Sequence, residues 1–212
     1  MARLQPFVLL ALLAATAWAQ DKSQPVPSSS RPASRATSIS GAGAISEGVY
    51  RNPFFGFSYK LPYGWVDRTG EMQVDSPNAS NAAKSLLLLA IFERPPEATT
   101  AETVNSAVVI AAEHVSSYSG MKTAADYFGP LTELATAKGF QAVEEPRQFS
   151  IGSAQLVRGD FTKPRGTSAV LQTSLVILEK GYEVSFTFIG GSPDEISELI
   201  EKLSFGAKKP ER

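Results

Sequence analysis

The sequence predicts an α+β domain, an α/β/α sandwich in which helices lie on the faces of a mostly antiparallel sheet. Residues 140–189 show a period of two that is broken by short turns, which is typical of antiparallel strands. Residues 85–93 are apolar at almost every position, as expected of a central strand that is covered on both faces. Segments with helical spacing lie before and after the strands, and each apolar face has to be buried against another element.

The composition is typical of one globular domain. The chain has 212 residues, of which 43% are hydrophobic and 19% are charged. Its formal net charge of -1 gives no general attraction for nucleic acid or for an anionic membrane surface. The lack of cysteine excludes disulfides, thiolate nucleophiles and cysteine-ligated metals. We expect no nucleic-acid partner, no metal and no cofactor.

Residues 1–19 have the pattern of a secretory signal peptide. Arg3 precedes an apolar run, and Ala17-Trp18-Ala19 fits a small-x-small cleavage site. The run is shorter than the roughly 20 apolar residues that cross a bilayer, and no later segment is long enough either. We predict cleavage near Ala19, no membrane span, and a periplasmic or secreted mature chain.

The mature chain is expected to begin with a disordered tether, residues 20–46. This stretch is rich in Ser, Pro, Ala and Gly and has no hydrophobic period. A single globular domain is predicted over residues 47–206, followed by a flexible tail over residues 207–212. No internal repeat is evident, and we expect a monomer.

The domain is predicted to open with an aromatic strand and a hairpin turn. The side chains of this strand that share one apolar face are Phe55, Phe57, Tyr59 and Leu61. Pro62-Tyr63-Gly64 predicts a turn, and Trp65 begins the returning strand. Most of this aromatic segment is interpreted as core, whereas Tyr63 at the tip is predicted to be exposed and available as a contact surface.

The first predicted helix covers residues 99–118. Thr99 and Glu102 form a capping box, and the apolar positions recur at helical spacing, namely Val104, Val108, Ala111, Val115 and Tyr118. His114, the only histidine of the chain, falls about 60° from the centre of this stripe. We interpret it as a residue on the flank of the helix, with a role as ligand or base as the alternative.

Two further helices and four strands are predicted. One helix covers residues 123–138, with a kink or a break at Gly129-Pro130, and a polar loop is expected over residues 70–84. The last helix begins at the N-cap Ser192, with a buried stripe of Ile196, Leu199, Ile200 and Leu203. The antiparallel strands between these helices are expected at residues 140–151, 153–163, 168–180 and 182–189.

Gly56, Phe57, Ser58, Pro62 and Trp65 form the pattern G-F-S-x-x-x-P-x-x-W. This pattern resembles the opening of the Mog1/PsbP-like family, and the predicted order of elements over residues 47–206 is also similar to that family. The resemblance implies an α/β/α sandwich and an accessory, binding or assembly role without enzymatic activity. It implies no specific partner, because members of the family differ widely in what they bind.

Three groups of residues in the sequence are candidate sites for chemistry. Asp67, Glu71 and Asp75 share a polar region, but their spacing lacks the glycine and the terminal glutamate of a known calcium loop. Glu144 and Glu145 are neighbours on a predicted strand and would point to opposite faces. Gly190-Gly191 could offer amides to an anion, but a simple turn into the last helix is favoured. No G-x-S-x-G elbow is present to indicate a hydrolase nucleophile.

These observations predict an exported accessory domain of the bacterial cell envelope that recognises a protein or a small ligand and has no enzymatic activity. One alternative is a soluble carrier with a pocket for a small ligand between sheet and helix. The other alternative is a hydrolase that uses an unrecognised serine or acidic site near His114.

Overall fold

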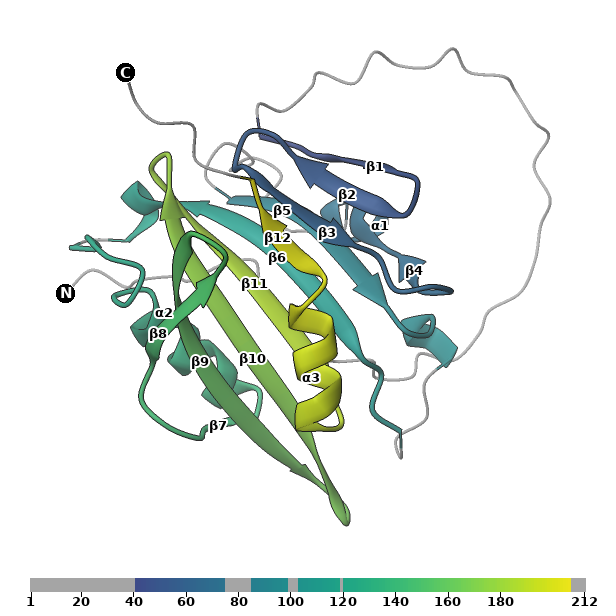
Figure 1. Ribbon diagram of the computed structural model, residues 1–212. Coiled ribbons are helices and arrows are strands. Elements are labelled where there is room, and N and C mark those ends of the chain that lie inside the picture. Colours follow the sequence, from purple (N-terminus) through teal and green to yellow (C-terminus); the bar gives the residue numbers. More distant parts are fainter. Residues whose placement is uncertain (1–40, 75–84, 99–102, 119, 207–212) are drawn as a thin grey trace.

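The computed structural model describes residues 41–74, 85–98, 103–118 and 120–206 (Figure 1). Two antiparallel sheets form most of the fold. The small sheet has the order β1-β2-β3-β12, with bounds Ala44–Ser46, Val49–Asn52, Phe57–Lys60 and Leu203–Phe205. The large sheet has the order β4-β5-β6-β11-β10-β9-β7, with bounds Val66–Asp67, Ser85–Phe92, Ala107–His114, Tyr182–Gly190, Ser168–Glu179, Ala154–Arg165 and Gln141–Ala142. Strand β8, Arg147–Ile151, also pairs with β9.

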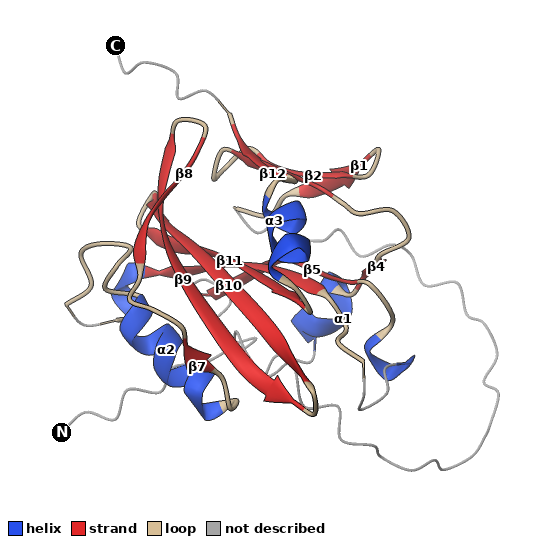
Figure 2. Cartoon of the chain, turned by 60° about the horizontal axis from the view of Figure 1, so that its bottom comes forward, coloured by secondary structure: helices blue, strands red, loops and turns tan. Residues whose placement is uncertain are grey.

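Helices lie on both faces of the large sheet, so the predicted α+β class is confirmed. Helix α2, Phe128–Ala137, covers one face, whereas α3, Pro193–Ile200, and the small sheet cover the other (Figure 2). Helix α1, Thr69–Val74, and two short 3-10 turns, η3 at Pro96–Ala98 and η4 at Val115–Ser117, complete the described elements. The sequence did not predict the separate small sheet.

Each face of the large sheet has its own hydrophobic core. Between the two sheets and α3, the largest fully buried side chains are Tyr59, Phe186, Phe188, Leu89, Ile91 and Ile110. The ring of Phe57 meets that of Phe186 edge to face, with 4.9 Å between centroids. Under α2, the second core includes Phe128, Leu131, Phe140, Phe161 and Val176. Burial of apolar area on both faces is the main stabilising contribution.

The predicted opening hairpin is wrong in its pairing, because its two strands belong to different sheets. β3 pairs with β2 and β12, whereas β4 pairs with β5. Residues 61–65, which we call the Tyr63 turn, therefore cross from one sheet to the other. The predicted burial of the aromatic face is confirmed for Phe55, Phe57 and Tyr59, and Trp65 is partly buried against the same core.

The predicted helix over residues 99–118 is wrong, because residues 107–114 form strand β6 between β5 and β11. Every residue of β6 before His114 is buried. A strand that is covered on both faces is apolar at every position, and it therefore also satisfies helical spacing. The consecutive β-branched residues Val108-Val109-Ile110 favour the strand. The capping-box residues 99–102 lie outside the described residues.

The second helix begins later than predicted, at Phe128. Thr123 lies in a turn, where the Asp126 carboxylate accepts hydrogen bonds from the backbone N–H groups of Lys122 and Thr123 at 2.9 and 2.8 Å. Gly129-Pro130 lies in the first turn of α2. A proline at that place needs no intrahelical amide donor, so it neither kinks nor splits the helix.

Helix α1 occupies the beginning of the region that was predicted as a polar loop, and it covers the outer edge of β5. The hydroxyl of Thr69 accepts a hydrogen bond from the backbone N–H of Ala90 at 2.8 Å, and Gln73 Nε2 donates to the backbone oxygen of Leu87 at 2.7 Å. A strand edge with satisfied backbone groups is protected from pairing with other chains. Residues 75–84 lie outside the described residues.

The predicted strands after residue 140 are confirmed as antiparallel strands, except that the first is divided into β7 and β8. Pro146 lies between these two pieces, and a proline cannot donate to a sheet ladder. The last helix ends earlier than predicted. Ile196, Leu199 and Ile200 are buried on α3, whereas Leu203 is the first residue of β12.

The described domain begins before residue 47, the predicted boundary. β1 pairs with β2, and Asn52 Nδ2 donates to the backbone oxygen of Gly41 at 2.8 Å. Residues 1–40 and 207–212 lie outside the described residues, so the signal peptide, most of the tether and the tail stay predictions. None of the helices in the described ranges has the length and apolar character needed to cross a membrane.

Candidate functional site

Tyr63 is exposed, as predicted, with a relative exposure of 105%. The backbone N–H of Trp65 donates to the oxygen of Pro62 at 3.4 Å, which closes the Tyr63 turn. Gly64 has a φ of 81°, a conformation that glycine adopts without a steric cost. The tyrosine ring is therefore held away from the domain by a defined turn, and its role as a contact surface stays a prediction.

Three polar side chains lie next to one another on the face of the large sheet that α2 covers. Ser85 on β5 is paired with Glu113 on β6, and Glu113 is paired with Glu183 on β11. Residues paired in this way share a face and have Cβ atoms about 4.5–5.5 Å apart. We call these three residues the carboxyl row. Glu113 and Glu183 are only 3% and 0% exposed, which is unusual for acids without a cationic partner.

Glu113 is held by two tyrosines that precede α2. The hydroxyls of Tyr118 and Tyr127 both donate to Glu113 Oε2, that of Tyr127 at 3.3 Å. The two rings meet edge to face with 5.6 Å between centroids. Burial raises the pKa of the Glu113 carboxyl, and the tyrosine hydrogen bonds lower this pKa in part. Burial and the charge of Glu113 also raise the pKa of both tyrosines, so their hydroxyls stay protonated and donate.

Glu183 has a different environment. Within the described residues, neither of its carboxyl oxygens has a hydrogen-bond partner. Burial, followed by the negative charge of Asp126, raises the pKa of Glu183 to about 7. A buried carboxylate without a partner is costly, and such a group takes up a proton instead.

The carboxyl row combines one carboxyl group that is held by two tyrosines with a second whose oxygens have no hydrogen-bond partner in the described residues. Among the described residues, no Lys or Arg forms an ion pair with Glu113 or Glu183. The described part of the chain also contains no group of three or more His, Cys, Asp or Glu residues placed to hold a metal ion.

His114 is the last residue of β6, not a residue on the flank of a helix. Its Nδ1 lies 2.8 Å from the hydroxyl of Ser116 and accepts a hydrogen bond from the Ser116 backbone N–H at 3.2 Å. The ring also meets Tyr182 edge to face at 5.0 Å between centroids. As the neighbour of Glu113 along a strand, His114 points to the opposite face of the sheet. The structure thus does not bring His114 and the carboxyl row together.

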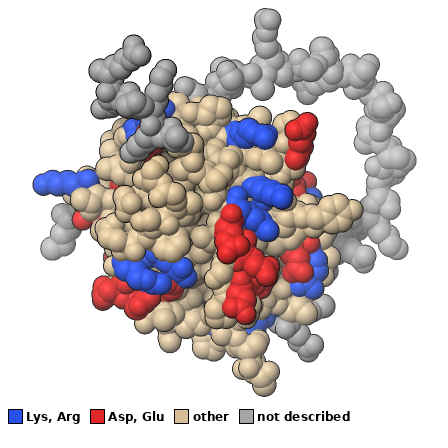
Figure 3. Space-filling model, in the orientation of Figure 1, with Lys and Arg blue, Asp and Glu red and all other residues tan. Residues whose placement is uncertain are grey.

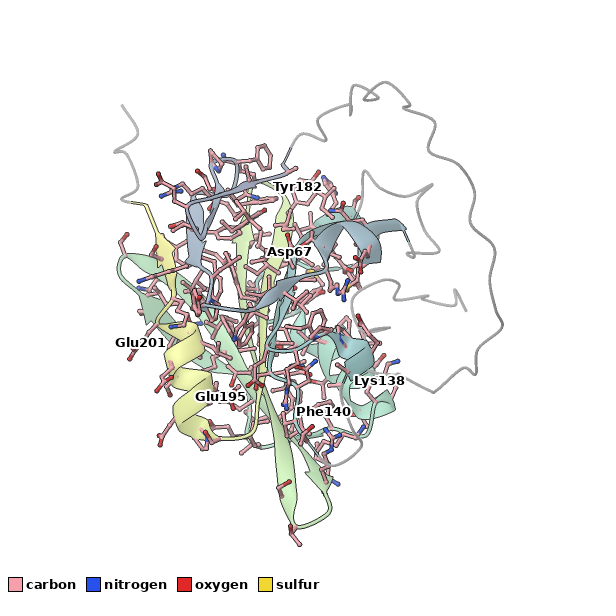
Figure 4. The ribbon with its side chains drawn as sticks, turned by 90° about the vertical axis from the view of Figure 1, so that its right-hand side faces the viewer. Asp67, Lys138, Phe140, Tyr182, Glu195 and Glu201 are labelled. Atoms are coloured by element: carbon pink, nitrogen blue, oxygen red, sulfur yellow. The ribbon has the colours of Figure 1, made fainter. Side chains whose placement is uncertain are left out.

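The acids of the region around α1 have structural partners. Asp67 (Figure 4) accepts hydrogen bonds from the backbone N–H and the hydroxyl of Thr69 at 2.9 and 2.6 Å, at the start of α1. Glu71 pairs with Arg68 at 2.8 Å. Asp75 lies outside the described residues. Asp67 and Glu71 therefore organise the beginning of α1.

Glu144 and Glu145 lie in a bend between β7 and β8, not on a strand as predicted, and both are exposed. Glu144 forms an ion pair with Arg147, which also lies 2.9 Å from Asp160. Figure 3 shows that acidic and basic side chains are interspersed on the face that carries α3. The surface shown there has no extended field of one sign.

Gly190-Gly191 forms the turn into α3, and the Gly191 amide is already bonded within this turn. The backbone N–H of Gly191 donates to Glu195 Oε2 at 2.8 Å, and the hydroxyl of Ser192 accepts from the Glu195 backbone N–H at 3.2 Å. The hydroxyl of Ser106 donates to the other oxygen of Glu195, which lies on the side of α3 that faces the strands (Figure 4). The interpretation as a strand-to-helix turn is confirmed.

Sequence reasoning missed the carboxyl row. Glu113 fell in a segment predicted as helix, and Glu183 appeared as one of the polar residues of an alternating strand. The sequence did contain a signal for this buried polar site, because Glu183, Ser185 and Thr187 alternate along β11 and so share one of its faces. A central strand with helices on both sides of its sheet has to bury that polar face as well, and all three are buried.

No protein-family model matches the chain, and no match was found among curated proteins. Among solved structures, the chain is similar to cyanobacterial PsbP (CyanoP) from Synechocystis, with 12% identity and a TM-score of 0.47 over 74% of this chain and 91% of that one. The Ran-binding protein Mog1p of Saccharomyces cerevisiae is 9% identical, with a TM-score of 0.41 over 71% of this chain and 90% of that one. LpqN, involved in cell envelope biogenesis of Mycobacterium tuberculosis, is 13% identical, with a TM-score of 0.36 over 71% of this chain and 83% of that one. These likenesses concern the fold alone, and the chain is similar in fold to PsbP and Mog1p, the family that the Gly56–Trp65 motif resembles.

Proposed function

We propose that the chain is an exported, non-catalytic accessory domain of the bacterial cell envelope, which recognises a partner protein through the Tyr63 turn. The observation that carries this proposal is the complete exposure of Tyr63, at 105%, on a turn whose backbone is fixed. A ring that is not packed in its own domain gains burial energy only in a complex.

The chemistry of the turn fits protein recognition. Tyrosine is enriched among residues that dominate binding energy, because its large ring has few rotatable bonds and carries a polar hydroxyl. Leu61, Pro62 and Trp65 are partly exposed beside it and provide an apolar surround. Since the turn is already ordered, binding requires little further loss of backbone entropy.

Residues 1–46 support the location outside the cytoplasm. The signal-peptide pattern of residues 1–19 directs export, and the Ser-, Pro- and Ala-rich composition of the following residues suits a spacer. Such a spacer allows the domain to reach a partner at a distance from its point of export.

The two alternative functions have less support from the geometry. A carrier would hold its ligand between the large sheet and a helix, but there Phe128, Leu131 and Ala135 of α2 are buried in the second core. A hydrolase near His114 would pair Ser116 with the ring, but among the described residues no carboxylate contacts this histidine. Both observations favour recognition at the surface.

The proposal is tested by photo-crosslinking in the cells from which the chain comes. Benzoylphenylalanine replaces Tyr63 in the full chain, and the matched control carries it at Val143, another exposed apolar position at 60% exposure. We expect a crosslinked protein from position 63 that position 143 does not give. An excess of the unlabelled wild-type chain should compete for this crosslink, whereas the variant Tyr63→Ser should not.

Tyr63→Ser should fold normally, because the ring is not packed, and an unchanged melting temperature verifies this. The proposal fails if both positions give the same products, or if the folded Tyr63→Ser variant competes as well as the wild type.

A further inference from the structure

The start of α2 is attached to the large sheet through the carboxyl row. Tyr127 is the N-cap residue of α2, and its hydroxyl donates to Glu113 at 3.3 Å. Tyr118 donates to the same oxygen, while Asp126 contributes a negative charge to the surroundings of Glu183. The contact between helix and sheet at this end therefore includes titratable groups beside the apolar packing of Phe128.

The neighbours of Glu183 include two other acids. Glu113 is its paired neighbour on β6, and the negative charge of Asp126, in the turn before α2, raises the pKa of Glu183 further. On β10, its paired neighbour is the uncharged Leu178. The cation Lys122 acts on Asp126, through its backbone N–H and its charge. Ionisation of Glu183 would thus place a second buried charge beside Glu113 without a counter-charge in the described residues.

We propose that the carboxyl row makes the attachment of α2 depend on pH: the helix is held on the sheet while Glu183 is protonated, and it detaches more often when Glu183 and Glu113 are both ionised. This property is independent of the Tyr63 turn and goes beyond the proposed function. An exported domain meets the pH of its surroundings directly, so α2 would respond to the acidity outside the cytoplasm.

The sign of the effect follows from proton linkage. An exposed glutamate has a pKa of about 4.3, whereas burial raises that of Glu183 to about 7. The folded state therefore binds more protons than a state with α2 detached. The stabilisation is fully present below about pH 4.3 and is lost as the pH rises through about 7.

Amide hydrogen exchange of the full chain measures this attachment. Protection factors, corrected for the intrinsic rate at each pH, are compared for α2 and for α3 at pH 5.5 and pH 8.5. Since one unit of pKa difference is a factor of ten, we expect protection of α2 to fall by at least about tenfold. Protection of α3, which contacts the opposite face of the sheet, should change much less.

Glu183→Gln keeps the shape of the side chain and removes its titration, so α2 should show nearly the same protection at both pH values. Glu183→Leu, which leaves no polar group unpaired, serves as a second variant and should behave in the same way. Glu198→Gln, an exposed acid on α3, is the control that should retain the wild-type pH dependence. The proposal is overturned if α2 protection is independent of pH in the wild type, or if the folded Glu183 variants keep the dependence.

Discussion

Tyr59 on β3 shows how one side chain joins the two layers of the main core. Its side chain is 0% exposed, and its hydroxyl donates to the backbone oxygen of Leu199 on α3 at 3.1 Å. Burial raises the pKa of the Tyr59 hydroxyl, so it remains a donor under all ordinary conditions. The ring fills the space between the small sheet and Phe188, while the hydroxyl satisfies a carbonyl near the end of the helix.

We expect Tyr59→Phe to lower the free energy of unfolding by about 0.5–1.5 kcal/mol, because one buried hydrogen bond is lost while the ring is retained. The Leu199 carbonyl keeps the backbone N–H of Lys202 as a donor at 3.3 Å. Urea unfolding followed by tryptophan fluorescence measures the difference. The matched control is Tyr63→Phe, which removes the same hydroxyl from an exposed ring and should change stability by less than about 0.5 kcal/mol. Equal losses in both variants would show that the hydrogen bond to Leu199 does not contribute.

At this scale, the sequence predicts side chains well where one rule decides their position. The alternation of apolar residues correctly predicted that Phe55, Phe57 and Tyr59 are buried, and the turn pattern Pro62-Tyr63-Gly64 correctly predicted that Tyr63 is exposed. The same rule failed for Glu183, because alternation separates two faces but does not say whether a further layer covers the polar one. The pairing of Glu113 with Glu183 depends on strand register, which a single sequence does not specify.

At the scale of the elements, α2 and β9 approach each other closely at Gly159. Gly159 on β9 lies under Phe128, the first residue of α2, and a Cβ atom added to Gly159 would be 2.4 Å from Phe128 Cε1. The absence of a side chain at this position therefore lets the helix lie directly on the sheet. Gly129, next to Phe128, has no heavy atom within 4 Å of the position of an added Cβ.

Gly159→Ala should destabilise the domain by about 1–3 kcal/mol, because the buried ring of Phe128 and the start of α2 have to move. Gly129→Ala should change stability by less than about 1 kcal/mol, because no atom lies near the added Cβ, and the higher helix propensity of alanine is offset by Pro130, which disfavours the helical region for the residue before it. Thermal unfolding of both variants provides the comparison. A loss of stability at position 129 as large as that at position 159 would contradict the close approach.

Strands β9, β10 and β11 and the beginning of α3 were predicted correctly, because the alternation of the strands and the Ser192 cap each fit only one kind of element. β6 was not, because Ala107–Glu113 is buried on both faces and so fits the period of a helix as well as that of a strand. Its assignment is decided by the neighbours β5 and β11, which pair with it over most of its length. Pairing with neighbouring strands thus outweighs the helical periodicity of the local sequence.

At the scale of the whole molecule, β12 near the C-terminus completes the small sheet, most of which comes from the N-terminal part of the domain. β12 pairs with β3, joining residue 203 to residue 59 and residue 205 to residue 57, and Phe205 packs against Phe57 and Phe186. The sequence predicted helix up to this point, because a strand of three residues carries almost no periodic signal. The small sheet, and with it the layer that covers one core, thus depends on residues far apart in the chain.

Removal of residues 203–212 should destabilise the domain strongly, by about 3 kcal/mol or more. Leu203 is 2% exposed, and loss of a buried leucine and of the pairing with β3 accounts for this magnitude. The truncated chain should also associate, because the free edge of β3 can pair with another molecule. The matched control lacks only residues 207–212 and should unfold like the full chain. Urea unfolding and size-exclusion chromatography measure both effects, and a monomeric, equally stable chain without β12 would show that the small sheet does not need its last strand.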